Sequence, residues 1–373
     1  MSQLEFYHVS KRFGAVSAVE DFSLTVKEGA FVSLLGPAKS GKTTLLRLAA
    51  GLEAPDRGTV CLDGCPIDLE PAPAIRNEVR LVFSDSALWP HMTVFQNVAF
   101  GLQNRGLPKK EILSRTEWAL KCLNAGDIAK ARPGDLTPTQ CSRIALARAL
   151  AGGARTILLD GLGDGQGDGQ DAAFRGDLKR LHQELGLTIL LATRDQQEAL
   201  SMAQTVILLE NGRLRLTGSP LELYLNPVDL YVAQKIGTPA INLVAGKAQV
   251  EGGLLTVQSI LGIAQFGEET FTEATRPNRL FDCLVGFRPE MAELSSTPRP
   301  GAYEARVYSC QPSGSETVVQ VSFEGKVLLV KLLGPRIYEP DQTVWLTVAP
   351  ECMNVFDAHS GMLIKRATDP VVV

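Results

Sequence analysis

One segment of this chain constrains its fold more than any other: Gly36-Pro37-Ala38-Lys39-Ser40-Gly41-Lys42-Thr43. An apolar run at 31–35 precedes it and helical periodicity follows at 42–52, so a G-x-x-x-x-G-K-T loop joins a predicted strand to a predicted helix. Glycines let the backbone N–H groups of such a loop turn toward phosphate oxygens, and the helix N-terminus adds the positive end of its dipole. The pattern therefore predicts a site for a nucleoside triphosphate, with ATP the simplest ligand, and the flanking elements disfavour a chance glycine-rich turn.

Individual residues of this loop and one downstream aspartate have expected roles. Lys42 is expected to reach the β- and γ-phosphates and Thr43 to ligate Mg²⁺, with Thr44 in the same binding segment. Asp160 ends an apolar run at 156–159, a strand-end position from which a carboxylate can hold the hydration shell of the magnesium ion. Taken alone, Asp160 would be interpreted as a turn residue. Together with the loop, it is predicted to bind the metal.

The apolar runs of the first 236 residues predict an α/β domain. Besides 31–35 and 156–159, the run at 188–193 lacks polar alternation, and amphipathic helical patterns separate the three. Fully apolar strands of this length are typical of a parallel sheet covered on both faces. The dipeptide Asn211-Gly212 between two strand-like segments predicts a β-hairpin near the end of this domain.

From residue 237 to residue 373 the pattern changes to short β-rich segments. Those at 317–321, 326–333 and 343–348 are separated by turn residues and predict a small all-β barrel or sandwich. We therefore expect two domains, 1–236 and 237–373, each long enough to have its own core.

The composition argues against several other classes of protein. A formal net charge of -4 and a pI of about 5.7 do not suggest a basic surface for nucleic acid. Seven cysteines without a C-x-x-C pair disfavour zinc and thioredoxin-like sites and favour a reduced, cytoplasmic chain. No apolar run reaches the roughly 18 residues of a membrane span and no leader pattern is visible, so membrane association is expected to go through a partner. The Gly/Asp/Gln-rich stretch at 161–170 is predicted to be a flexible loop and not a calcium site.

A set of further segments carries a family resemblance; they are 34–52, 87–94, 97–102, 144–150, 195–199 and 286–290. Together they resemble the ATP-binding subunits of ABC importers, in the subfamily that serves maltose, glycerol phosphate and polyamine transporters. The resemblance implies a P-loop domain with the helical insertion of ABC proteins, followed by a small OB-like regulatory β-domain. It implies ATP and Mg²⁺ as cofactors, and a second ATPase subunit and integral membrane permease subunits as partners. It also implies a peripheral location on the cytoplasmic face of the inner membrane.

The positions that carry catalysis in that family hold other residues here. Gly161 stands where the family has the glutamate that polarises the attacking water, and glycine cannot act as a general base. Arg194 replaces the switch histidine; it keeps a positive charge but does not titrate near neutral pH. Ser84 replaces the Q-loop glutamine, and Gly167 falls at the aspartate of the D-loop. We therefore expect no intact catalytic set and weak or absent hydrolysis.

The signature motif of the family is also altered, and reads Leu136-Thr137-Pro138-Thr139-Gln140 in place of L-S-G-G-Q. Thr137 keeps a hydroxyl, whereas Pro138 loses a backbone N–H and Thr139 cannot copy the close approach of glycine. Because the signature normally caps the γ-phosphate of the opposite subunit, this cap is expected to be weaker.

Four residues elsewhere have a functional and a structural interpretation. The resemblance places Phe13 under the adenine ring, whereas spacing alone would make it a core residue. Arg143 follows the signature as in the family, or lies on a solvated helix face. Trp89 and Met92 line the groove that receives the transporter's coupling helix, or pack in the core.

Two functions remain open from the sequence. The first is an ATP-binding subunit of an importer for a sugar, a polyol or a related solute, working best in a heterodimer with an intact ATPase, although a homodimer is not excluded. The alternative is a non-transport regulator that binds ATP and uses its β-domain for sensing or for sequestering a protein. A P-loop kinase or GTPase is disfavoured because no N-K-x-D motif follows a strand.

Overall fold

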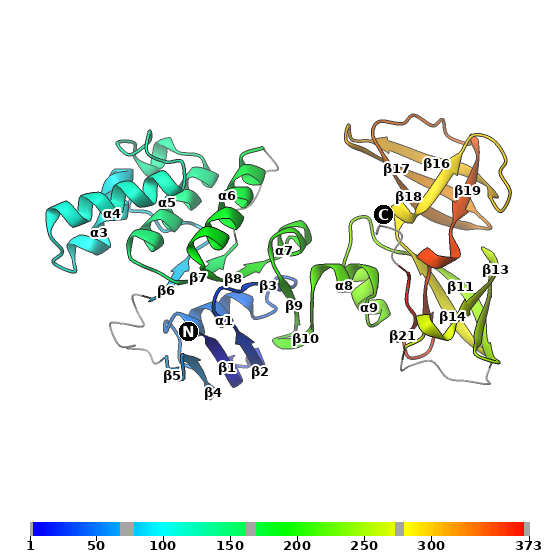
Figure 1. Ribbon diagram of the computed structural model, residues 1–373, viewed down its shortest axis with the longest axis horizontal. Helices are drawn as coiled ribbons and strands as arrows, with labels where there is room; N and C mark the ends of the chain where they lie inside the picture. The colour runs from blue at the N-terminus through cyan, green and yellow to red at the C-terminus, as the bar shows by residue number, and fades with distance from the viewer. Residues whose placement is uncertain (1–2, 68–77, 162–168, 273–279, 369–373) are drawn as a thin grey trace. The chain divides into compact units, whose positions relative to one another are not determined.

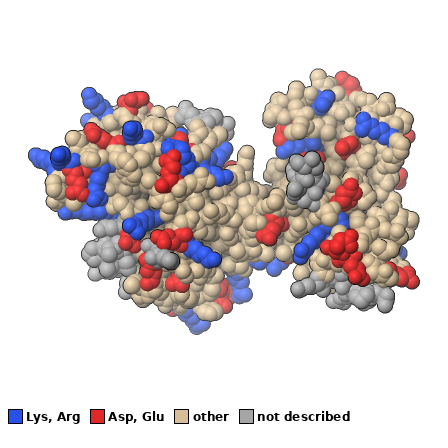
Figure 2. Space-filling model, in the orientation of Figure 1, with Lys and Arg blue, Asp and Glu red and all other residues tan. Residues whose placement is uncertain are grey.

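The structure, a computed structural model, describes residues 3–67, 78–161, 169–272 and 280–368, and forms two compact units, Met1–Pro220 and Leu221–Val373. Figure 1 shows helices together with strands in the first unit, and mostly strands in the second. The boundary between the units therefore falls at 220/221, whereas the sequence predicted it at 236/237. Residues 221–236 pack with the second unit. Among the described residues, no helix combines the length and apolar character that crossing a membrane requires. On the face drawn in Figure 2, their basic and acidic side chains are interspersed on both units.

The first unit contains two sheets and a set of helices. Its strands are β1 (Leu4–Phe13), β2 (Val16–Val26), β3 (Phe31–Leu35), β4 (Arg57–Leu62), β5 (Cys65–Pro66), β6 (Val79–Val82), β7 (Thr156–Asp160), β8 (Thr188–Thr193), β9 (Thr205–Glu210) and β10 (Arg213–Gly218). Its helices are α1 (Lys42–Ala49), α3 (Val94–Gln103), α4 (Lys109–Cys122), η1 (Pro133–Asp135), α5 (Pro138–Ala151), α6 (Gly169–Leu185) and α7 (Gln196–Met202).

The larger sheet of this unit has the order β10-β9-β3-β8-β7-β6. Neighbours among β9, β3, β8, β7 and β6 pair in parallel, and β10 joins through an antiparallel hairpin with β9. Asn211 and Gly212 form the hairpin turn with φ of 49° and 78°, which these residue types tolerate best. The predicted parallel sheet and hairpin are thereby confirmed.

One core joins the parallel sheet to α1 and to the antiparallel sheet β2-β1-β4-β5. Phe6 of β1 and Phe22 of β2 meet edge to face at 5.4 Å and pack in the same cluster as Leu34 of β3 and Leu46 of α1. Each such fully buried side chain contributes about 1.5–3 kcal/mol by leaving water. Figure 1 shows α6 and α7 on the other side of the sheet from α1, and α3, α4 and α5 grouped beyond it as the expected helical insertion.

The second unit is built on two antiparallel sheets. Helices α8 (Pro220–Leu225) and α9 (Leu230–Lys235) lead into strands β11 (Asn242–Glu251), β12 (Leu254–Ser259), β13 (Gly262–Gly267), β14 (Leu280–Phe287), β15 (Ala292–Ser295), β16 (Tyr303–Pro312), β17 (Glu316–Phe323), β18 (Lys326–Leu333), β19 (Thr343–Val348), β20 (Asn354–Asp357) and β21 (Leu363–Lys365). Single 3-10 turns are η2 (Glu268–Thr270), η3 (Pro289–Met291) and η4 (Pro350–Cys352). The orders are β13-β12-β11-β14-β20-β21 and β15-β19-β16-β17-β18, with one shared core. The predicted all-β, OB-like domain is confirmed.

Arg288 explains why the segment before residue 237 belongs to the second unit. Its side chain is 3% exposed and donates to the carbonyl oxygens of Tyr224 (2.7 and 3.1 Å), Ala233 (3.0 Å) and Ile236 (2.5 Å). Its guanidinium carbon lies 4.3 Å from the centre of the Tyr224 ring. Burial, together with a hydrogen bond to Glu290, raises the pKa of the Tyr224 phenol, so the hydroxyl stays protonated and donates. The guanidinium therefore caps the carbonyl ends of α8 and α9.

Candidate nucleotide site and a neighbouring pocket

The ends of three parallel strands bring the predicted nucleotide-binding residues together. Leu35 of β3 is level with Thr193 of β8, and Ala192 of β8 is level with Asp160 of β7. Gly36, Arg194 and Gly161 therefore follow one another along the same carboxyl edge of the sheet, which is where open α/β sheets bind ligands. Register alone thus assembles residues that are more than 150 positions apart in the chain.

The glycines of the loop are needed because the loop lies close to neighbouring backbone. A Cβ on Gly36 would lie 2.4 Å from the carbonyl oxygen of Leu209, and one on Gly41 would lie 2.3 Å from that of Ala18. Gly41 also has a φ of 98°. Any larger residue at either position would displace the loop.

The amino group of Lys42 lies inside the loop, where its hydrogen-bond partners are neutral oxygen atoms. Its side chain donates to Gly36 O (2.8 Å), Pro37 O (2.7 Å) and Ser40 Oγ (3.1 Å). Burial, and then the positive charge of Arg194, lower the pKa of Lys42 to about 8, against the opposing charge of Asp160. A mostly buried cation with only neutral hydrogen-bond partners fits a phosphate-binding role.

Thr43 and Asp160 are in direct contact across the sheet edge. The Thr43 hydroxyl donates to Asp160 Oδ1 at 2.9 Å, although 116 residues separate them in the chain. A hydroxyl and a carboxylate are oxygen ligands of the kind that Mg²⁺ prefers. The residues present therefore fit a magnesium ion together with a nucleotide.

Of the predicted catalytic positions that the structure describes, Gly161, Ser84 and Arg194, none carries a carboxylate. Gly161 has a φ of 81°, a backbone conformation that L side chains rarely adopt. Ser84 is exposed and follows β6, whose Val82 is level with Leu159 of β7. Gly167 and the predicted flexible loop, apart from its ends, lie outside the described residues. A side chain placed at position 161 would therefore be strained by the backbone conformation found here.

The turn that carries Arg194 is held on both sides. The backbone N–H of Asp195 donates to Thr193 Oγ1 (2.9 Å), and the Thr193 hydroxyl donates to the buried Glu198 (2.6 Å). Asp195 Oδ1 accepts from Gln197 N (2.7 Å) and so caps α7. The Arg194 side chain is exposed, and within the described parts of the chain it makes no hydrogen bond or ion pair.

The altered signature segment forms a well-made helix start. Thr137 is the N-cap of α5; its hydroxyl accepts from Gln140 N (3.3 Å), and the Gln140 side chain accepts from Thr137 N (2.9 Å). Pro138 occupies the first helical position, where a backbone N–H is not needed by the helix. The loss of that N–H therefore leaves the helix intact and removes only a donor that a ligand could use.

Other residues singled out from the sequence have specific places. Phe13 ends β1 and is 48% exposed, with Lys11 Nζ 5.3 Å from its ring centre, so it is not a core residue. Arg143 pairs with Asp177 and donates to Leu123 O (3.0 Å), which makes it a link between helices and not a free surface residue.

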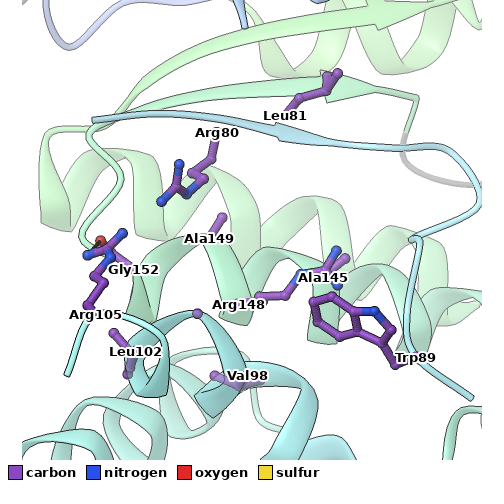
Figure 3. A pocket seen from close by; sticks show the side chains of 11 residues that line it. Arg80, Leu81, Trp89, Val98, Leu102, Arg105, Ala145, Arg148, Ala149 and Gly152 are labelled. Carbon is purple, nitrogen blue, oxygen red and sulfur yellow. Dashed lines mark hydrogen bonds between the residues drawn. The ribbon is translucent and has the colours of Figure 1, made fainter. Parts of the chain in front are cut away.

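A pocket of about 230 Å³ lies between β6 and the helical group. It is lined by Arg80, Leu81, Trp89, Val98, Gly101, Leu102, Arg105, Ala145, Arg148, Ala149 and Gly152. Figure 3 shows Trp89 beside Arg148 at one end, and Arg80 with Arg105 at the other. Trp89 thus lines this pocket, and Met92 is not among its lining residues.

Two arginines of the pocket, Arg105 and Arg148, are bound to backbone carbonyls, and Arg148 also lies over a ring. Arg148 donates to Ser86 O (3.1 Å) and Ala87 O (2.8 Å) and lies 5.1 Å from the Trp89 ring centre, and Arg105 donates to Gly152 O (2.9 Å). Burial lowers the pKa of Arg148, and burial and the charge of Arg105 lower the pKa of Arg80. Sequence analysis missed this set because the arginines are far apart in the chain and no local pattern joins them.

Comparison of the sequence with known proteins gives consistent matches over both units. Residues 19–161 match the ABC transporter family and residues 285–356 match the TOBE domain. An uncharacterized ABC transporter ATP-binding protein of Sinorhizobium fredii, y4oS, is 33% identical over 98% of this chain and 95% of its own length. An sn-glycerol-3-phosphate import ATP-binding protein of Ralstonia nicotianae, UgpC, is 33% identical over 98% of this chain and 99% of its own length. A spermidine/putrescine import ATP-binding protein of Haemophilus influenzae, PotA, is 39% identical over 63% of this chain and 62% of its own length.

Solved structures resemble the first unit. A dimeric ATP-binding cassette, MJ0796, in a post-hydrolysis state bound to ADP and Pi, matches with a TM-score of 0.53 and 27% identity over 58% of this chain and 98% of that chain. A cbiO1 protein from Clostridium perfringens, part of a cbiONQ ABC transporter complex, matches with a TM-score of 0.54 and 27% identity. The match covers 59% of this chain and 89% of that chain.

Proposed function

Because the chain belongs to the family of ABC transporter ATP-binding proteins, we propose that it is the ATP-binding subunit of an ABC import transporter. The observation that carries the proposal is the assembled P-loop site, with Lys42 inside the loop and Thr43 bonded to Asp160. Relatives named as import proteins for glycerol phosphate and for polyamines support an importer. The proposed solute is a sugar, a polyol or a related small molecule, and the proposed location is the cytoplasmic face of the inner membrane.

The same residues define the proposed cofactors, ATP and Mg²⁺. The loop N–H groups and Lys42 would hold the phosphates, Thr43 and Asp160 would hold the metal, and Phe13 would stack on the base. Bound Mg²⁺ supplies neutralisation of phosphate charge. The Phe13 ring is half exposed, with Lys11 Nζ 5.3 Å from its centre, and its exposed part could accept a stacking partner.

The site is proposed to hold ATP without efficiently breaking it. No carboxylate stands at Gly161, and loss of a general base typically costs about 10²–10⁴-fold in rate. Arg194 and Ser84 replace the other two side chains that the family uses at the terminal phosphate. A heterodimer with an intact ATPase subunit is the workable assembly, because each composite site in this family combines the P-loop of one chain with the signature of the other. Uptake driven by this chain alone with its permease, at normal ATP turnover, would contradict the heterodimer.

ATP turnover by the purified chain tests the proposed catalytic defect. We expect roughly micromolar-to-millimolar ATP binding and negligible phosphate release. The double change Gly161→Glu with Arg194→His should restore turnover only in part, because a glutamate at a φ of 81° costs about 1–2 kcal/mol and the signature stays altered. Adding Lys42→Met to the double variant should abolish any restored turnover. Robust turnover by the unmodified chain would refute the proposal.

We further propose that the pocket between β6 and α3 receives a segment of the permease. Its lining combines apolar side chains with three guanidinium groups, so a docking helix that carries a carboxylate would complement it. This extends the expected role of Trp89 to the whole pocket.

Filling the pocket is expected to abolish permease binding without harming the fold. Gly101 lies in α3 and lines the pocket, and a Cβ there would meet nothing within 4 Å. Gly101→Leu should therefore block docking while stabilising the helix by about 0.5–1 kcal/mol. The measurement is co-purification of permease subunits from native membranes.

A matched control is available in the same unit. Gly176 lies in α6, is exposed, and a Cβ there also meets nothing within 4 Å, so Gly176→Leu should leave co-purification unchanged. Equal permease recovery with both variants would contradict docking at the pocket. If the unmodified chain recovers no permease at all, the importer proposal itself fails.

A further inference from the structure

The hairpin turn between β9 and β10 is packed against β2, and Gly212 makes the contact. A Cβ on Gly212 would lie 2.8 Å from the carbonyl oxygen of Ala18 and 3.2 Å from the Cα of Val19. The backbone N–H of Glu20 donates to Gly212 O at 2.8 Å, and Gly212 is buried. The hairpin turn is therefore joined to residues 18–20 of β2, and it leaves no room for a side chain at position 212.

The same carbonyl oxygen of β2 also lies against the P-loop. A Cβ on Gly41 would lie 2.3 Å from Ala18 O, and Gly41 directly precedes Lys42. We propose that Gly212 is a positioning residue for nucleotide binding: it holds Ala18 in place, and Ala18 holds the P-loop at Gly41. This inference rests on the proposed nucleotide binding and adds to it a residue outside the P-loop that fixes the position of the loop.

The hairpin also contacts the other end of the P-loop. A Cβ on Gly36 would lie 2.4 Å from the carbonyl oxygen of Leu209, which lies in β9 three residues before Gly212. The β9–β10 hairpin therefore lies directly against Gly36, and it reaches Gly41 through Ala18. Since these are the two glycines of the loop, a shift of the hairpin turn would move the backbone N–H groups that are expected to face phosphate.

The obstacle to a side chain at Gly212 is backbone, which cannot rotate away as the end of a long side chain could. Val19 is fully buried in the core of the first unit, and it pairs with Lys11 of β1. Because the interior is close-packed, a methyl group on Gly212 would push the Ala18 carbonyl and would not find free space. That carbonyl abuts Gly41, so the displacement would be passed to the P-loop.

The first unit contains a second hairpin turn with the same backbone shape, which provides a matched control. Asn211 and Gly212 have φ of 49° and 78°, and Asp63 and Gly64, between β4 and β5, have φ of 52° and 73°. A Cβ on Gly64 would meet no described atom within 4 Å. Gly212→Ala and Gly64→Ala therefore impose similar strain from a side chain at positive φ, and only Gly212→Ala adds the contact with Ala18.

The test is the affinity of the purified chain for two ligands, each with Mg²⁺: ATP, by calorimetry, and inorganic tripolyphosphate, by competition with ATP. Gly212→Ala should weaken the binding of both by about tenfold, because the P-loop holds phosphates and not the base. Gly64→Ala should leave both affinities within about twofold of the unmodified chain. Asparagine tolerates positive φ better than alanine does, so Gly212→Asn should lower the unfolding midpoint less and still weaken both ligands.

The unfolding midpoint separates positioning from a merely structural role. If Gly212→Ala and Gly64→Ala lower the midpoint alike and neither changes the affinities, the inference is overturned. Weaker ATP binding with unchanged tripolyphosphate binding would also overturn it, since the effect would then lie at the base. If Gly212→Ala does not fold, the same two affinities of Gly212→Asn decide the question. These results would leave the proposed nucleotide binding standing, whereas failure of the unmodified chain to bind ATP would overturn both.

Discussion

Replacing Lys42 is expected to weaken ATP binding by at least about 100-fold. Its amino group lies within the loop, where charge-assisted hydrogen bonds to phosphate are worth about 1.5–3 kcal/mol each, and at least two can form. Lys42→Met removes the charge and keeps the volume of the stem, which matters because the side chain is 8% exposed. The measurement is the dissociation constant for ATP with Mg²⁺.

A lysine on a helix surface provides the control for this substitution. Lys121 is exposed in the last turn of α4, so Lys121→Met should leave ATP affinity unchanged. Both variants should give the far-ultraviolet circular dichroism of the unmodified chain. If Lys42→Met bound ATP within about threefold of the unmodified chain, phosphate binding by this loop would be excluded.

Truncating Arg288 is expected to destabilise the second unit by about 3 kcal/mol or more, at about 1–3 kcal/mol for each buried carbonyl left without a donor. The guanidinium serves three backbone carbonyls, and its removal by Arg288→Ala leaves the ends of α8 and α9 unsatisfied in a buried place. Arg288→Lys should recover only part of the loss, because one ammonium cannot reach three carbonyls as a planar guanidinium does. A Cβ on Gly237 would lie 2.8 Å from Arg288 Nη1, so the chain there is also shaped around this side chain.

Tryptophan fluorescence can isolate the unfolding of this unit. Of the three tryptophans, Trp345 lies in β19, whereas Trp89 and Trp118 belong to the first unit, so urea unfolding is followed in a Trp89→Phe, Trp118→Phe background. Arg299→Ala is the control: its side chain is 60% exposed and 3.8 Å from Glu293, a pair worth at most about 1 kcal/mol. Equal stability of the Arg288→Ala and Arg299→Ala variants would mean that the buried network does not hold the two helices.

Local patterns predicted much of the fold because they report local physics. The strands at 31–35 and 188–193 were predicted with the bounds that the structure has, since fully apolar runs of this length have few other places to lie. The hairpin at Asn211-Gly212 followed from residues that tolerate positive φ. The start of the second unit could not be predicted from local patterns. The segment before residue 237 is held in that unit by hydrogen bonds to Arg288, which lies more than 50 residues downstream.

The candidate site was predictable in its residue types and not in its geometry. The P-loop spacing indicated phosphate binding, and the strand end indicated Asp160, yet their hydrogen bond depends on the order of β3, β8 and β7. Sequence reasoning treated Gly161 as a missing side chain, whereas the structure adds a backbone that resists the missing residue. The sequence suggested that Pro138 weakens the signature motif because proline has no backbone N–H. The structure places Pro138 in the first turn of α5, where the helix does not need that N–H.

By itself, the sequence determined that this chain has a P-loop on an α/β sheet and a β-domain after it, and it predicted altered residues at the positions that would act on the terminal phosphate. Spacing and residue type suffice for these conclusions because they concern neighbours along the chain. Only the tertiary structure decided which distant side chains share a site: the Thr43 hydroxyl on Asp160, three arginines around one pocket, and Arg288 on the carbonyl ends of α8 and α9. The reason is that strand register and helix packing bring such groups together, and neither leaves a pattern at any single point of the sequence.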